Sequence, residues 1–156
     1  MSKNIAIIYR NYNKKINISL VKDIKQFCKI NRRKFFLANN IKIAIKLNLD
    51  GVYIPSFNKK NEINYYNKKR NFIVLGSAHN LKEIRIKEKQ KVNCIFLSPI
   101  FYVKKSKKSL GIQKFNFLSN YTKKKIICLG GLNKKNMKKI KLLNIYGIAS
   151  ISLFKK

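Results

Sequence analysis

Four short apolar runs in the second half of the chain each end in small or turn-forming residues. They lie in the segments Phe72–His79, Cys94–Phe101, Ile126–Leu132 and Gly147–Ser152. Each run is continuous rather than alternating, which is typical of a strand buried on both faces. Glycine, serine and proline at the exits let the backbone approach a ligand closely. In a barrel of parallel strands these exits gather at one end, which carries the active site.

Three further runs in the first half continue the pattern, and most strands are followed by helical periodicity. The expected strands are Asn4–Arg10, Lys34–Ala38, Gly51–Ile54, Phe72–Leu75, Cys94–Leu97, Ile126–Leu129 and Ile148–Ile151. The expected helices are Ile18–Ile30, Ile41–Leu47, Leu81–Lys91, Gln113–Tyr121 and Lys134–Leu143, with residues 58–70 as a loop or weak helix. Asn80 and Glu83 resemble a capping box at the start of the third helix.

Strands that alternate with helices predict an α/β fold with a parallel sheet. Seven strands fit either a TIM-type (β/α) barrel that is short of one unit or an open doubly wound sheet. The glycine-rich dinucleotide fingerprint does not follow the first strand, which favours the barrel. With 156 residues, we expect a single domain that spans residues 1–156.

The three cysteines, Cys28, Cys94 and Cys128, lack CxxC spacing, and two lie in apolar strand segments. Free, buried thiols in a reducing compartment are the simplest interpretation. No signal peptide is evident, and no apolar run is long enough for a membrane span. We therefore expect a cytoplasmic protein that does not associate with membranes.

The charge of the chain is extreme, with 37 Lys and Arg against 5 Asp and Glu, for a net charge of +32. One interpretation is non-specific binding of nucleic acid or another polyanion. The other is a compositional bias that places lysine at every solvated position, and the even spread of lysine favours it. The five acids are Asp23, Asp50, Glu62, Glu83 and Glu88. None of them lies at a strand exit, where a carboxylate metal site would need them.

Seven motifs occur in a fixed order: IIYR, LANN, GVYIPS, GSAHN, SPIFYVKKSKKSLG, LGGL and GIASIS. Their order and spacing resemble the thiamine phosphate synthase/TenI family, from about Ile5 to Leu153. The resemblance implies a truncated (β/α) barrel that lacks the family's first βα unit and its last helix. Such a barrel has two unpaired strand edges, and forming a homodimer is one way to close the gap.

The resemblance also implies an activity. Synthases of the family couple a pyrimidine diphosphate to a thiazole phosphate: pyrophosphate leaves, a pyrimidine cation forms, and the thiazole nitrogen attacks it. Two aspartates hold Mg²⁺ for this reaction. A related branch is a metal-free isomerase that moves a proton on a carboxythiazole phosphate with a histidine. A non-catalytic phosphate- or polyanion-binding module is the third hypothesis.

The family's site residues carry over position by position. The resemblance assigns pyrophosphate or pyrimidine binding to Arg10, Asn39 and Lys107. It assigns catalysis to Ser77 and His79. It assigns the thiazole phosphate to Gly130, Gly131, Ser150 and Ser152. The two magnesium aspartates correspond to Asn40 and Asn58, and an amide is a poor substitute for a carboxylate on a hard dication.

Each assignment has a structural alternative. The glycine pair binds a phosphate through its amides or only forms a tight turn. His79 is a general acid or base, or it caps a helix. Arg10 pairs with phosphate oxygens or makes a contact at the barrel rim. Asn39 binds a phosphate or caps the next helix. The lysines around Lys107 either neutralise pyrophosphate or are solvated as elsewhere.

Overall fold

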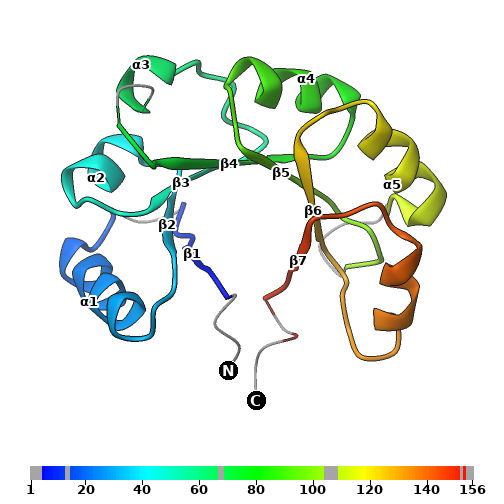
Figure 1. Ribbon diagram of the computed structural model, residues 1–156, viewed down its shortest axis with the longest axis horizontal. Helices are drawn as coiled ribbons and strands as arrows, with labels where there is room; N and C mark the ends of the chain where they lie inside the picture. Colours follow the sequence, from blue (N-terminus) through cyan, green and yellow to red (C-terminus); the bar gives the residue numbers. More distant parts are fainter. Residues whose placement is uncertain (1–4, 13–14, 67–68, 104–108, 152, 154–156) are drawn as a thin grey trace. The chain divides into compact units, whose positions relative to one another are not determined.

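The computed structural model describes residues 5–12, 15–66, 69–103, 109–151 and 153 (Figure 1). By their contacts these residues divide into two compact units, 1–75 and 76–156. Strand β4 (Ile73–Ala78) runs across the boundary and contributes to both. Within each unit the strand pairs given by the register are parallel, and the strands follow one another in chain order.

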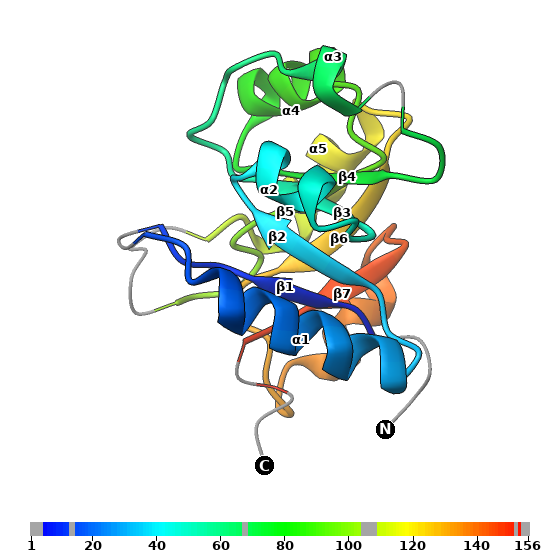
Figure 2. The same ribbon diagram turned by 90° about the vertical axis from the view of Figure 1, so that its left-hand side faces the viewer.

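The first unit is built on three parallel strands with a continuously apolar interior. Its elements are β1 (Ile7–Tyr9), α1 (Ile18–Ile30), β2 (Phe35–Ala38), α2 (Ile41–Lys46), β3 (Gly51–Ile54) and α3 (Ile63–Tyr66). Strand β2 pairs with β1 on one side and with β3 on the other. Every residue of β2 and β3 is buried, as expected for strands covered on both faces. Figure 2 shows α1 running alongside β1 and β2.

The second unit repeats the same βα arrangement. Its elements after β4 are α4 (Leu81–Lys89), β5 (Cys94–Leu97), α5 (Gly111–Asn120), β6 (Lys125–Leu129), a 3₁₀ helix η1 (Met137–Leu142) and β7 (Gly147–Ala149). Strand β6 pairs with β5 and with β7. Strand β5 is fully buried, whereas β7, like β1 in the first unit, is only half-buried. The expected fold class, a TIM-type α/β barrel shortened to seven parallel strands, is confirmed among the described residues.

Asparagine side chains set the start of three helices. The side-chain oxygens of Asn17, Asn40 and Asn80 each accept a hydrogen bond, 3.0 Å long, from the backbone N–H three residues further on. These bonds satisfy N–H groups that lack a partner within the helix. The predicted boundaries of α1, α2 and α4 therefore agree with the structure to within two residues.

Two sequence predictions of secondary structure need correction. The α-helix expected over Lys134–Leu143 is a six-residue 3₁₀ helix, because Asn133 and Asn136 bond each other's backbone N–H and form a turn there. Strand β4 also continues past Leu75 to Ala78, so the GSA segment belongs to the strand rather than to its exit.

A lysine is buried beneath β4. Lys87 of α4 is fully buried and lies against Gly76, where a Cβ would come within 2.9 Å of the Lys87 Cδ. Its Nζ donates a 2.8 Å hydrogen bond to the Gln90 side-chain oxygen. Burial lowers the pKa of Lys87 to about 8, although the charge of Glu83 opposes this. Gly76 is therefore required for α4 to pack closely on β4.

The three cysteines are free and buried, as the sequence predicted. Burial raises the pKa of Cys128 to about 12, which keeps it a neutral thiol. Within the described part of the chain, none of the helices combines the length and the apolar character that crossing a bilayer requires.

Candidate functional site

Arg10 directly follows β1 and is stacked on two aromatic rings. Its guanidinium carbon lies 5.4 Å from the Tyr12 ring centroid and 5.7 Å from that of Tyr53. Tyr12 in turn meets Phe57 edge to face at 5.3 Å. Burial raises the pKa of the Tyr12 phenol, an effect that the nearby Arg10 partly offsets. Tyr12 is therefore a neutral ring at neutral pH, and Arg10 is an exposed cation held against aromatic faces.

Asn39 lies at the end of β2 in a left-handed backbone conformation, with φ of 57°. Its N–H donates to the Tyr53 carbonyl at 2.8 Å, and its side-chain oxygen accepts from the Asn58 side-chain N–H₂ at 2.8 Å. The alternative that Asn39 caps the next helix is wrong, because Asn40 fills that position. Asn39 instead links the exits of β2 and β3.

The two positions that correspond to the family's magnesium aspartates are occupied by amides with other partners. The Asn40 side-chain oxygen accepts from the Ile43 N–H, and the Asn58 side-chain oxygen accepts from the Lys60 N–H at 2.9 Å. Neither side chain carries charge. In the parts of the chain that the structure describes, no three His, Cys, Asp or Glu residues lie close enough to share a metal. This donor set does not fit Mg²⁺, which prefers carboxylates.

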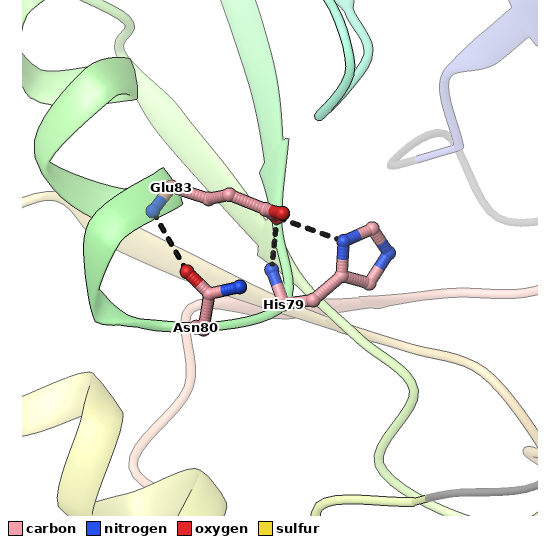
Figure 3. Close-up of polar contacts among 3 residues, drawn as sticks. All are labelled: His79, Asn80 and Glu83. Carbon is pink, nitrogen blue, oxygen red and sulfur yellow. Dashed lines mark hydrogen bonds and ion pairs between the residues drawn. The ribbon is translucent and has the colours of Figure 1, made fainter.

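In the second unit, His79 follows β4 and pairs with Glu83 on the first turn of α4 (Figure 3). One Glu83 carboxylate oxygen lies 2.8 Å from the His79 Nδ1 and also accepts from the His79 backbone N–H at 2.8 Å. An ionised carboxylate has only acceptors, so Nδ1 carries a proton. In the neutral ring, Nε2 then has a free lone pair.

Glu83 does not form the capping box that the sequence suggested. Asn80 caps α4, but the Glu83 carboxylate binds the N–H of His79 rather than that of Asn80 (Figure 3). It therefore fixes both the backbone and the ring of the chain's one histidine. The side chain of His79 is 45% exposed, so the ring is accessible to a small molecule.

Ser77 lies within β4 rather than beyond it and is buried. Because side chains alternate along a strand, and because Gly76 faces α4, Ser77 faces the opposite side of the sheet. It lies two residues before His79 in the same segment.

Gly130 and Gly131 follow β6 with φ values of 100° and 71°, which favour glycine. The carbonyl oxygens of Leu129 and Gly130 accept from the N–H groups of Ile100 and Phe101. That of Gly131 accepts from the Asn136 side chain at 2.8 Å. In a trans peptide the N–H points opposite to the preceding C=O. The amides of Gly130 and Gly131 are therefore directed away from the segment that packs on the pair.

Two structural details qualify the phosphate site that is expected at the glycine pair and Ser150. The glycine pair does not lead straight into a helix, so the amides that remain for an anion are those of the loop itself. Ser150, just after β7, accepts a 3.0 Å hydrogen bond from the Leu153 N–H and remains half-buried. Lys107 and Ser152 lie outside the described residues.

The comparisons with known proteins identify the family. The sequence profile described as Thiamine monophosphate synthase matches residues 4–154, and the chain belongs to this family. It is 30% identical to a thiamine-phosphate synthase of Prochlorococcus marinus over 142 residues, which are 86% of this chain and 40% of that protein. It is 28% identical to the enzyme of Pyrococcus horikoshii over 120 residues, which are 76% of this chain and 58% of that protein.

A solved structure supports the fold. Thiamine phosphate pyrophosphorylase from Pyrococcus furiosus superposes with a TM-score of 0.74 at 18% identity, covering 96% of this chain and 72% of that one. The chain thus spans about half the length of the two sequence relatives, and it shares the fold of a protein of this type.

Sequence reasoning missed two groups of residues. The sequence motif predicts only a capping role for Glu83, although its spacing of four from His79 at a helix start is a signal for side-chain contact. Tyr53 and Phe57 form the second group. Tyr53 lies beside Arg10, and Phe57 beside Tyr12, through the pairing of β1, β2 and β3, which no local pattern reveals.

Proposed function

We propose that the chain is a transferase of thiamine biosynthesis that joins a pyrimidine diphosphate to a thiazole phosphate. In this reaction the bond from the pyrimidine methylene carbon to the diphosphate oxygen breaks, and its electron pair leaves with pyrophosphate. The lone pair of the thiazole nitrogen then forms the new carbon–nitrogen bond. Membership of the family supports the reaction, and the glycine pair after β6 is the observation that carries it.

The proposed roles of the residues are those that the family resemblance assigns. The loop amides at Gly130 and Gly131 bind the thiazole phosphate, with Ser150 and Ser152 completing that subsite. Arg10, Asn39 and Lys107 bind the diphosphate. Ser77 and His79 contact the reacting groups, and the Glu83 carboxylate keeps the His79 ring in one orientation.

The test is product formation from the two precursors with the purified chain, with magnesium and with a chelator. Thiamine phosphate and pyrophosphate should appear in equal amounts. No product under either condition would exclude the reaction. The variant Gly131→Ala should lose activity, while Gly147→Ala is the matched control, because a Cβ there meets nothing within 4 Å.

A metal-free isomerase is the second candidate, and the His79–Glu83 pair is the observation that favours it. A neutral imidazole with a protonated Nδ1 and a free Nε2 can accept a proton from carbon. The test is exchange of the ring proton of a carboxythiazole phosphate into deuterated water. Unchanged exchange in His79→Ala would exclude this role. Glu83→Gln should slow exchange less than His79→Ala does, because the amide still offers an oxygen to Nδ1.

Polyanion binding is a third, separate proposal. A groove of about 640 Å³ on the first unit, between α1 and the end of α2, is lined by Lys22, Lys25, Lys29 and Lys46 and by no acid. For single-stranded RNA, the logarithm of the binding constant falls linearly with the logarithm of the salt concentration. Changing these four lysines to glutamine should make this slope shallower by about 0.7 for each phosphate contact that is lost. The control changes Lys134, Lys135, Lys138 and Lys139, which are exposed elsewhere. Equal losses in both variants would exclude the groove.

Homodimer formation and a cytoplasmic location remain predictions from the sequence, as does the single domain. Sedimentation of the full chain at several concentrations tests the first. The half-buried edge strands β1 and β7 are the surfaces that a second copy would cover.

A further inference from the structure

The exits of β1, β2 and β3 carry a cation but no carboxylate. Arg10 is exposed there, and the amides of Asn39, Asn40 and Asn58 surround the neighbouring turns. Of the acids near these strands in sequence, Asp50 precedes β3 and accepts a hydrogen bond from the Phe35 N–H at the opposite ends of the strands. Glu62 follows β3, and its charge acts on Tyr66 of α3. In the described residues, no carboxylate forms an ion pair with Arg10, and no cluster of metal-binding side chains lies at these exits.

The amides at the family's metal positions have structural roles of their own. Asn40 starts α2, and Asn58 holds both the Lys60 N–H and the side chain of Asn39. A metal at this place would have to compete with these hydrogen bonds for neutral oxygens. Mg²⁺ gives up its water reluctantly and is bound in proteins through carboxylates. The residues at these two positions therefore do not fit the Mg²⁺ that the family implies.

The surroundings of Arg10 compensate for the missing metal. The rings of Tyr12 and Tyr53 lie beside its guanidinium, and the Tyr12 hydroxyl also accepts a hydrogen bond from it. The guanidinium has five N–H donors, so the others are left for an anion. Tyr53 is buried, and Tyr12 is braced by Phe57. A planar guanidinium binds two phosphate oxygens at once, and stacking on rings reduces the rotamer freedom that this binding would otherwise cost.

We propose that the strand exits of the first unit bind a diphosphate group through Arg10 without a divalent cation, and that Tyr12 and Tyr53 position the guanidinium. This inference rests on the proposed synthase function, whose diphosphate substrate it concerns. It assigns Arg10 the charge neutralisation that metal ions supply in the family. Tyr12 and Tyr53 are positioning residues, because they act through Arg10.

The experiment is calorimetric titration of the full chain with inorganic pyrophosphate at low salt, in EDTA and in magnesium. The dissociation constant in EDTA should lie within about threefold of that in magnesium. Arg10→Gln should weaken binding by about 10- to 100-fold, the range expected for lost charge-assisted hydrogen bonds. Arg33→Gln is the matched control, because Arg33 also stacks on a ring, at 5.6 Å from Phe27, but on another part of the unit.

Two further variants separate positioning from general structural effects. Tyr12→Leu should weaken pyrophosphate binding by about two- to fivefold, the worth of a partly exposed cation–π contact. Tyr12→Phe keeps the ring and loses only the hydroxyl that accepts from Arg10, so it should weaken binding less than Tyr12→Leu does. The double variant Asn40→Asp with Asn58→Asp restores two carboxylates and preserves the helix cap. In this double variant, magnesium should strengthen pyrophosphate binding by about tenfold or more.

The outcomes are distinct. A tenfold or larger gain from magnesium in the unmodified chain would overturn the inference, as would equal losses in Arg10→Gln and Arg33→Gln. A double variant that stays indifferent to magnesium would also contradict it. Product formed only with magnesium would refute the metal-free site and leave the synthase proposal standing. Arg10-dependent binding of pyrophosphate in EDTA with no product would refute the synthase proposal and leave the binding site.

Discussion

The two units have the same βα architecture but differ in what lies in their interiors and at their strand exits. The core of the first unit is apolar, whereas all the buried polar residues among those described lie in the second unit: Ser77, Lys87, Gln90, Ser98 and Ser119. At the exits, the first unit presents side chains, namely an arginine, aromatic rings and amides. The second presents the ring of His79 and backbone amides beside two glycines.

This difference shows how a binding surface depends on composition. A site made of backbone amides requires only small residues, which a lysine-rich chain can supply as well as any other. A carboxylate metal site requires acids, and the chain has five. Three of these already have structural partners. Asp50 accepts from the Phe35 N–H, and Glu83 binds His79. Glu88 accepts from both Arg85 and Thr122. Few acids thus remain for ligand chemistry in either unit.

The largest expected effect is that of Gly131→Ala in the second unit. A Cβ there would lie 2.6 Å from the Tyr102 carbonyl oxygen, and φ is 71°. The left-handed conformation and the overlap together should lower the free energy of unfolding by about 2 to 5 kcal/mol. Gly111→Ala is the control: its φ is 69°, but nothing lies within 4 Å, so we expect a loss of about 1 kcal/mol. Equal losses in urea unfolding would show that overlap contributes nothing.

The buried Lys87 should make the second unit respond to pH. Its pKa falls from 10.5 in the unfolded chain to about 8 in the folded one, so the unfolded chain binds more protons between these values. The free energy of unfolding should therefore rise by about 3 kcal/mol as pH increases from 8 to 10.5. Lys87→Met should remove this increment.

The measurement for Lys87 is the difference between the two proteins in urea unfolding at each pH. Tyr66 and Cys128, whose pKa values are raised to about 12, give the opposite trend, but they are present in both proteins and cancel. A difference that does not change between pH 8 and 10.5 would contradict the lowered pKa.

The helix caps offer a smaller effect with one site in each unit. Asn40→Ala and Asn80→Ala each remove a hydrogen bond to a helix N–H and should each cost about 1 kcal/mol. Asn40→Asp and Asn80→Asp keep an acceptor and should cost little. If the alanine variants unfold at the same urea concentration as the unmodified chain, the caps do not stabilise α2 and α4.

The smallest expected effect concerns Glu88 and acid. Burial raises the pKa of its carboxyl, but hydrogen bonds from Thr122 and Arg85 outweigh this and leave the pKa below 4.5. Its contribution is therefore present above pH 4.5 and is lost as pH falls further. Thr122→Val should move the midpoint of acid unfolding upward by a few tenths of a pH unit, as followed by circular dichroism. An unchanged midpoint would show that this hydrogen bond does not stabilise the ionised form.

Most of the fold could be predicted because each strand contains an apolar run and three helices begin at an asparagine cap. The 3₁₀ helix η1 could not be, because the reciprocal bonds of Asn133 and Asn136 depend on side-chain orientation rather than on periodicity. The positions of Arg10, His79 and the glycine pair at strand ends followed from motif order. The contact of Arg10 with Tyr53 joins residues 43 positions apart, and that of Asn39 with Asn58 joins residues 19 positions apart. Both depend on strand register, so neither could be predicted from local sequence.

The half-buried strands β1 and β7 each pair with one neighbour in their unit, which leaves a ladder edge that other chains can extend. Identical molecules with a net charge of +32 repel one another strongly at low ionic strength, so this repulsion opposes intermolecular sheet growth. Added salt weakens this repulsion, because at 0.1 M charges more than about 10 Å apart are largely screened from one another. This protein should therefore stay dispersed in dilute buffers and associate more readily as salt is added, which is the opposite of ordinary salting-in.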